Sequence, residues 1–95
     1  MGVYDEVVAG LQAGKAASGL SCADVRALLT RVGFNVKDGK RGGHKVVTHP
    51  HLPGFYSTGY NCRGSGGPVD RNYLGHLLNV IRRYEEPLKR YLGEQ

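Results

Sequence analysis

Residues 21–36, SCADVRALLTRVGFNV, contain a capped helix that leads into the start of a strand. Ser21 is a suitable N-cap, and Asp24 three residues later places a negative charge at the positive end of the helix. Apolar residues then recur at the i, i+3, i+4, i+7 spacing of a helix with one buried face: Val25, Leu28, Leu29 and Val32. Gly33 stands where a glycine commonly ends a helix. We therefore expect a helix over Cys22–Val32.

The residues after this helix predict three strands. Phe34–Lys37 alternates apolar and polar side chains, and Asp38-Gly39 favours a turn between antiparallel strands. His44–Thr48 forms a second strand, which ends before Pro50 because proline cannot donate a hydrogen bond to a sheet. Phe55–Tyr60 forms a third. Short connections between the three strands predict an antiparallel meander.

A helix is expected at each end of the chain. Tyr4, Val7, Val8 and Leu11 follow helical spacing and predict a short helix over Val3–Ala13. Near the other end, Asp70 is the expected N-cap of a final helix. A wide apolar stripe follows it: Tyr73, Leu74, Leu77, Leu78, Ile81 and Tyr84.

Pro87 should stop or kink this final helix after Glu86, and the end beyond should fray. The order of elements predicts an α+β, two-layer fold, α-α-β-β-β-α, with helices on one face of a three-stranded antiparallel sheet and the other face free. We expect a single domain over 1–95, divided into an N-terminal helix and linker (1–20), a core (21–86) and a C-terminal tail (87–95).

Composition is that of a soluble globular domain, with 40% hydrophobic and 22% charged residues in 95. The apolar runs are too short to cross a membrane, and acidic Asp5 and Glu6 do not suit a signal peptide. Cys22 and Cys62 lack the spacing of a metal site. We expect two free thiols in a reducing cytoplasm, with a single long-range disulfide as the alternative.

The net charge of +5 is concentrated in the middle of the chain. Residues 1–36 hold three cations and three acids, whereas residues 37–83 hold eight Lys or Arg against two Asp. This distribution favours a face that binds a polyanion such as a nucleic acid. The alternative is that the charge serves only solubility.

The stretch Lys37–Lys45, KDGKRGGHK, combines four cations, three glycines and a histidine. Glycines let a backbone approach a ligand closely, and Lys and Arg are the usual phosphate contacts. His44 could exchange protons near neutral pH, which makes it the candidate general acid or base. The alternative is a solvated basic turn with an idle histidine. The candidate RNA contacts are Lys37, Lys40, Arg41, Lys45, Arg63 and Arg71, with Tyr73 as a further candidate.

Other chemistry is less well supported by the sequence. His49 and His51 have no neighbouring Cys, Asp or Glu to complete a metal site, so we expect no metal and no other cofactor. His76 lies on the flank of the final helix and is expected to be a surface residue. The basic half contains no close pair of carboxylates, which argues against a two-metal nuclease. RNA cleavage by the substrate's own 2′-OH needs only proton transfer and cations on the phosphate.

These residues resemble the HicA toxins. The likeness lies in the helix from Ser21 that ends at Gly33-Phe34, the basic turn into Gly43-His44, the strand ending at His49-Pro50, and the helix through Leu77 to Tyr84. It is closest to the variant with an extra N-terminal helix. The family usually has Gly-Ser-His where this chain has Gly42-Gly43-His44.

The resemblance implies a fold like a double-stranded-RNA-binding domain and metal-independent cleavage of mRNA, with His44 as the catalytic residue. It also implies a type II toxin–antitoxin system and a HicB-like antitoxin that covers the site. Two alternatives stay open: a module that binds RNA without cutting it, and an accessory protein with no nucleic-acid role.

Overall fold

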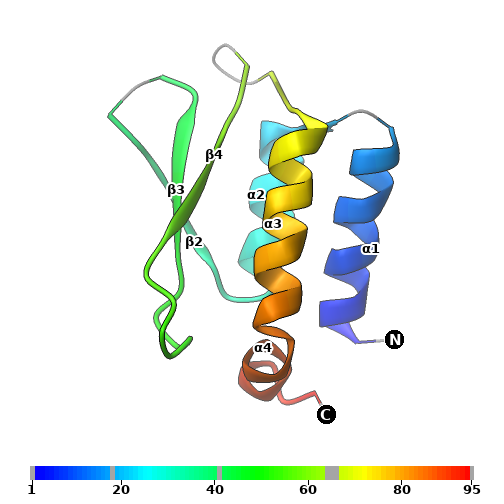
Figure 1. The fold of residues 1–95 in the computed structure, drawn as a ribbon, viewed down its shortest axis with the longest axis vertical. Coiled ribbons are helices and arrows are strands. Elements are labelled where there is room, and N and C mark those ends of the chain that lie inside the picture. The colour runs from blue at the N-terminus through cyan, green and yellow to red at the C-terminus, as the bar shows by residue number, and fades with distance from the viewer. Residues whose placement is uncertain (1, 18, 41, 64–66, 95) are drawn as a thin grey trace.

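The computed structural model describes residues 2–17, 19–40, 42–63 and 67–94, which form an α+β domain of 38 × 28 × 17 Å (Figure 1). Four helices, a three-stranded antiparallel sheet and a two-stranded sheet make up the described part. The elements are α1 (Val3–Ala16), β1 (Leu20–Ser21), α2 (Cys22–Arg31), β2 (Asn35–Asp38), β3 (His44–Thr48), β4 (Thr58–Asn61), β5 (Pro68–Val69), α3 (Arg71–Arg83) and α4 (Glu85–Tyr91).

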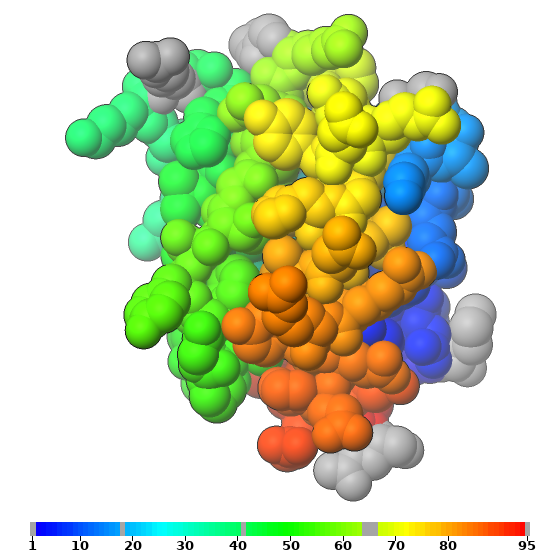
Figure 2. All heavy atoms as spheres, viewed as in Figure 1, coloured from blue at the N-terminus to red at the C-terminus, as the bar shows by residue number. Residues whose placement is uncertain are grey.

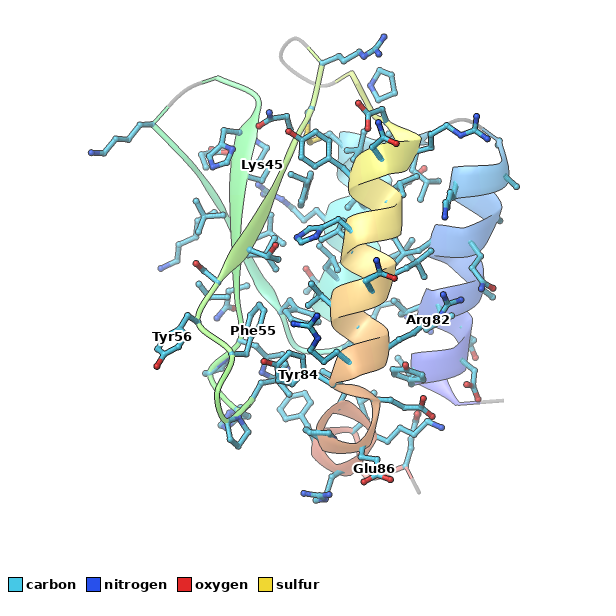
Figure 3. All side chains as sticks on the ribbon, in the orientation of Figure 1. Lys45, Phe55, Tyr56, Arg82, Tyr84 and Glu86 are labelled. Carbon is cyan, nitrogen blue, oxygen red and sulfur yellow. A yellow bond between two sulfur atoms is a disulfide. The ribbon has the colours of Figure 1, made fainter. Side chains whose placement is uncertain are left out.

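The predicted meander is confirmed, with strand order β2-β3-β4 and both pairs antiparallel. Strand β3 has the predicted bounds, but β4 begins three residues later than expected. Phe55 packs edge-to-face against Phe34 and Tyr84, with ring centroids 5.7 and 5.5 Å apart, so it joins the core before the strand begins. Figure 3 shows Phe55 and Tyr84 facing one another, whereas Tyr56 points into solvent and is 91% exposed.

The two-layer arrangement expected from the sequence is wrong, because α1 adds a layer of its own. Helices α2 and α3 lie beside the three-stranded sheet, and α1 packs on the side of α2 and α3 that faces away from it (Figure 1). Its buried stripe contains Tyr4, Val7 and Leu11, and the Tyr4 hydroxyl donates to the carbonyl of Ile81, 3.4 Å away. The helix therefore covers other helices, not the sheet.

The caps of α2 and α3 are as predicted. The Ser21 hydroxyl accepts from the backbone N–H of Asp24, and the Asp70 carboxylate accepts from the N–H groups of Asn72 and Tyr73. These caps satisfy N–H groups that have no partner inside a helix. The cap at Asp70 directs the chain from β5 into α3.

A short second sheet, absent from the predicted fold, joins β1 to β5. It brings the start of α2 close to the chain that follows β4. Cys22 and Cys62 form a disulfide there, with Cα atoms 5.6 Å apart across 40 residues of sequence. The expectation of two free thiols is therefore wrong. Sequence spacing could not reveal this pair, because its approach depends on the second sheet.

The C-terminal segment also differs from the prediction. Helix α3 ends at Arg83, four residues before Pro87, and α4 begins at Glu85 with Pro87 in its first turn, where proline is tolerated. The further turn expected over Leu88–Leu92 is present as part of α4, and the described residues after it contact the N-terminus. Glu94 accepts hydrogen bonds from the N–H groups of Val3 and Tyr4, at 2.6 and 3.2 Å, and so caps α1.

None of the described helices is long and apolar enough to cross a membrane.

Candidate functional site

His44 is the first residue of β3 and is exposed. In the sheet register it lies opposite Asn61, the last residue of β4. Its Nδ1 is 2.9 Å from Asn61 Oδ1, and Asn61 Nδ2 donates to the Tyr73 hydroxyl, also at 2.9 Å. A chain of hydrogen bonds thus links the histidine through β4 to the first turn of α3.

This chain of contacts assigns the tautomer of His44. Because Asn61 Oδ1 can only accept, Nδ1 of His44 carries the hydrogen and donates it. In the neutral imidazole Nε2 then holds the lone pair. A histidine held at Nδ1 with an open Nε2 is arranged to take up a proton.

Two glycines make room for the His44 ring. A Cβ added at Gly39 would overlap His44 Cδ2, and a Cβ added at Gly59 would lie 3.2 Å from His44 Cε1. The backbone N–H of Gly39 also donates to the His44 carbonyl at 2.8 Å. The ring therefore lies between the turn after β2 and the middle of β4, where larger residues would displace it.

Gly43, which stands where the HicA pattern has serine, has a φ of +85°. This is the left-handed region that glycine enters at little cost and other L residues avoid. Its carbonyl accepts from the N–H of Cys62 at 2.7 Å, one residue beyond the β3–β4 pairing. The glycine thus sets the direction in which the chain enters β3 at His44.

The surface is hollowed on both sides of His44. One hollow, of about 690 Å³, is lined by His44 with Asp38, Gly39, Lys40 and Val46. The other, of about 620 Å³, lies between β4 and α3 and is lined by His44 with Thr58, Gly59, Asp70, Asn72, Tyr73 and His76. Figure 2 shows the face on which the side chains of the strands, in green, meet those of α3, in yellow and orange.

The hollow between β4 and α3 contains a second histidine. Nε2 of His76 is 2.5 Å from the Thr58 hydroxyl, so α3 and β4 are joined here as they are at Tyr73 and Asn61. His76 is exposed. The expectation that His76 lies on the surface of the final helix is confirmed, but the sequence did not show that it borders the same hollow as His44.

The candidate RNA contacts fall in different places. Lys40 lines a hollow with His44, and Lys37 is exposed on β2. Arg63 and Arg71 are exposed near the loop that joins β4 to α3. Arg41 lies outside the described residues.

Lys45 alternates with His44 along β3, so it points to the opposite face of the sheet. There its ammonium group pairs with Asp38, and Arg26 of α2 lies 3.7 Å from the same carboxylate. The hydrogen bond from Lys45 and its charge lower the pKa of Asp38. Lys45, labelled in Figure 3, is therefore engaged within the protein on the face turned away from His44.

His49, just beyond the other end of β3, is 6% exposed. Its Nε2 donates to the carbonyl of Val32 at 3.0 Å, and its Nδ1 accepts from the N–H of His51 at 3.1 Å. Burial lowers its pKa, since a charged imidazole would lose its hydration there. Both ring nitrogens are thus used in holding the fold. In the described part of the chain, no group of three or more His, Cys, Asp or Glu side chains is placed to hold a metal ion.

Comparisons with protein-family models, with curated proteins and with solved structures find no match to this chain. The site is therefore interpreted from its own geometry.

The sequence predicted His44 and Lys40 as site residues, and the structure places both on one hollow; Tyr73 was named only as a possible RNA contact. Sequence reasoning missed Asn61, Thr58 and His76, since their roles depend on β4 lying beside α3. One signal was present in the sequence: Asn61 and Thr58 are three residues apart, as are Tyr73 and His76. Thr58 can meet His76 while Asn61 meets Tyr73 only when β4 and α3 run in opposite directions. A single sequence does not show this direction.

Proposed function

We propose that this protein is an endoribonuclease that cleaves mRNA without a metal ion, as the toxin of a HicA-type toxin–antitoxin system. The observation that carries the proposal is the exposed His44, held at Nδ1 by Asn61 with Nε2 open beside two hollows. The basic residues Lys37 and Lys40 support it, because cations near such a site would hold the phosphates.

The proposed reaction uses the 2′-OH of the substrate as its nucleophile. His44 Nε2 accepts the proton of this hydroxyl, and the 2′-oxygen attacks the adjacent phosphorus. The bond to the 5′-oxygen breaks, leaving a 2′,3′-cyclic phosphate and a 5′-hydroxyl. A protein that positions this reaction needs no nucleophile of its own.

The glycine before His44 bears on the comparison with the HicA pattern. With φ at +85°, Gly43 holds the backbone in a conformation that would strain a serine. This chain therefore has no serine hydroxyl before His44, and the Asn61 amide supports His44 instead. The proposal assigns the supporting role to Asn61.

The HicA-type assignment carries two further proposals. A HicB-like antitoxin would bind the protein and cover the site around His44. The activity would lie in the cytoplasm, where mRNA is translated and where disulfides are uncommon. The Cys22–Cys62 disulfide makes the redox state of the protein a necessary control in any assay.

The test is cleavage of a labelled mRNA in the presence of a metal chelator, comparing the parent protein with His44→Gln. We expect cleavage by the parent to give 2′,3′-cyclic phosphate ends, and the variant to be slower by about 10²- to 10⁴-fold. His51→Gln is the matched control, because His51 is exposed beyond the C-terminal end of β3 and lines neither hollow. Cleavage by His44→Gln at the parental rate would refute the assignment of the site.

The second candidate is a module that binds RNA without cutting it. It is favoured by the absence of any side chain at position 43, directly before His44. RNA binding that weakens steeply with salt, with no product after long incubation, would support this candidate over the nuclease.

A further inference from the structure

We propose that His76 is a second catalytic residue, the general acid that protonates the 5′-oxygen leaving group while His44 acts as the base. The scissile phosphodiester would lie in the hollow between β4 and α3. This inference rests on the proposed ribonuclease function and assigns to it the proton donor that the reaction needs.

The first argument is the shared hollow. His44 comes from β3 and His76 from α3, and both line the same space of about 620 Å³. Gly59 lies on the same hollow and has no side chain to fill it. Two imidazoles from separate elements thus border one open space that a substrate could enter.

The second argument is the way each ring is held. Asn61 and Thr58 are three residues apart on β4, about 10 Å along a strand. Asn61 holds His44, whereas Thr58 holds His76. The two imidazoles are therefore anchored at different points of β4, and both border the hollow beside it.

The contact to Thr58 suits the protonated form of His76. In an imidazolium both ring nitrogens carry hydrogen, and the Thr58 hydroxyl can accept from Nε2. The other ring N–H is then the one that can be donated. Asp70, the N-cap of α3, lines the same hollow. The other ionisable groups near His76 are His44 and Tyr73 in this hollow, and Tyr56, Arg83 and Tyr84 in the adjoining one.

His44 and His76 together account for both protons that move in the proposed reaction. The 2′-OH proton passes to His44 Nε2, the new bond forms between the 2′-oxygen and phosphorus, and the bond from phosphorus to the 5′-oxygen breaks. The 5′-oxygen takes its proton from His76. Each turnover therefore leaves His44 protonated and His76 neutral, and exchange with water restores both.

The competing explanation is that His76 only joins α3 to β4. A structural role predicts that His76→Gln lowers stability and leaves the pH dependence of cleavage unchanged. An acid predicts a bell-shaped pH profile in the parent, with the limb at high pH lost in His76→Gln. Thr58→Val keeps the imidazole and removes its anchor, so it should lower the rate but retain that limb.

The deciding experiment uses two RNA substrates that differ in one atom. The second has sulfur in place of the bridging 5′-oxygen, and a thiolate leaves without needing a proton. We expect His76→Gln to be slower by about 10²-fold on the oxygen substrate and to recover most of this loss on the sulfur substrate. His44→Gln should be slow on both, because the base is still missing.

The outcomes separate the two proposals. If the parent protein and His51→Gln cleave RNA while His76→Gln is unimpaired, or is equally impaired on both substrates, His76 is not the acid and the proposed function stands. If the parent protein binds RNA without cleaving it, both proposals fail.

Discussion

The two histidines at the ends of β3 show how position decides what the same side chain does. His44 is the first residue of the strand and is exposed. Asn61 holds one of its ring nitrogens, and the other has no hydrogen-bond partner within the described part of the chain. His49 follows the strand inside the core, with both ring nitrogens used by the backbone. They are five residues apart, and the sequence around both is rich in polar groups.

The two rings differ in whether they can gain a proton without losing a hydrogen bond. Charging His49 would remove its hydrogen bond from His51 and place a cation where water is scarce, so burial lowers its pKa and favours the neutral form. His44 can gain a proton at Nε2 without losing its contact to Asn61. Under the proposed function, the exposed end of β3 transfers protons, whereas the buried histidine beyond its other end supports the fold.

Reduction of the Cys22–Cys62 disulfide should have the largest effect on stability and should act mainly at the His44 end. Closing 40 residues of chain is worth about 4 kcal/mol of unfolding free energy in the chain-entropy model. Cys62 follows Asn61 directly, and its N–H bonds to the carbonyl of Gly43. We expect the Cys62 amide to exchange with deuterium faster after reduction. Denaturant unfolding curves in the same buffers measure the loss of unfolding free energy.

A Cys22→Ala, Cys62→Ala double variant is the control, since its stability should not respond to reductant. If the reduced parent protein unfolds at the same denaturant concentration as the oxidised one, the disulfide does not support this end of β3.

His49→Ala should lower the unfolding free energy by about 2 kcal/mol, because it opens a cavity and leaves the Val32 carbonyl without its donor. Urea unfolding measures this loss. His51→Ala, at an exposed neighbour, should change stability by less than about 0.5 kcal/mol. Equal effects of the two substitutions would contradict the distinction between buried and exposed positions.

The pH dependence of the unfolding free energy also tests the role of buried His49. Because the pKa of His49 is lower in the folded state, the unfolded chain binds more protons as pH falls below the ordinary value near 6.5. The contribution of neutral His49 is fully present above that pH and is lost as pH falls through the folded pKa. The His49→Ala variant should lack this component. Asp38 and Glu6, whose pKa values are lowered, act in a more acidic range.

Gly43→Ser should have the smallest effect, a loss of about 1 kcal/mol of unfolding free energy from the left-handed backbone. It introduces the serine of the HicA pattern, so under the proposed function the cleavage rate tells whether a hydroxyl at this position contributes. We expect no gain in rate, because Asn61 already holds His44. Gly42→Ser is the control, since a Cβ there meets no atom within 4 Å. A variant that is both stable and faster would show that the hydroxyl has a role here.

The local elements were predictable because their signals are local. Ser21 and Asp70 cap helices with their own side chains, and the bounds of β3 follow from His44–Thr48 and the proline after it. The order of the three-stranded meander followed from short connections. The third layer, the β1–β5 sheet and the cap from Glu94 did not, since each joins residues far apart in the chain.

The sequence by itself determined the helices and the meander, because periodicity and caps act over a few neighbours; His44 as the reactive residue stays a prediction from its chemistry. Only the tertiary structure decided that Cys22 meets Cys62, that Lys45 turns away to Asp38, and that His76 borders the same hollow as His44. The physical reason is that a strand pairs with residues many positions away, and a hydrogen bond or a disulfide forms only where the fold brings its partners together.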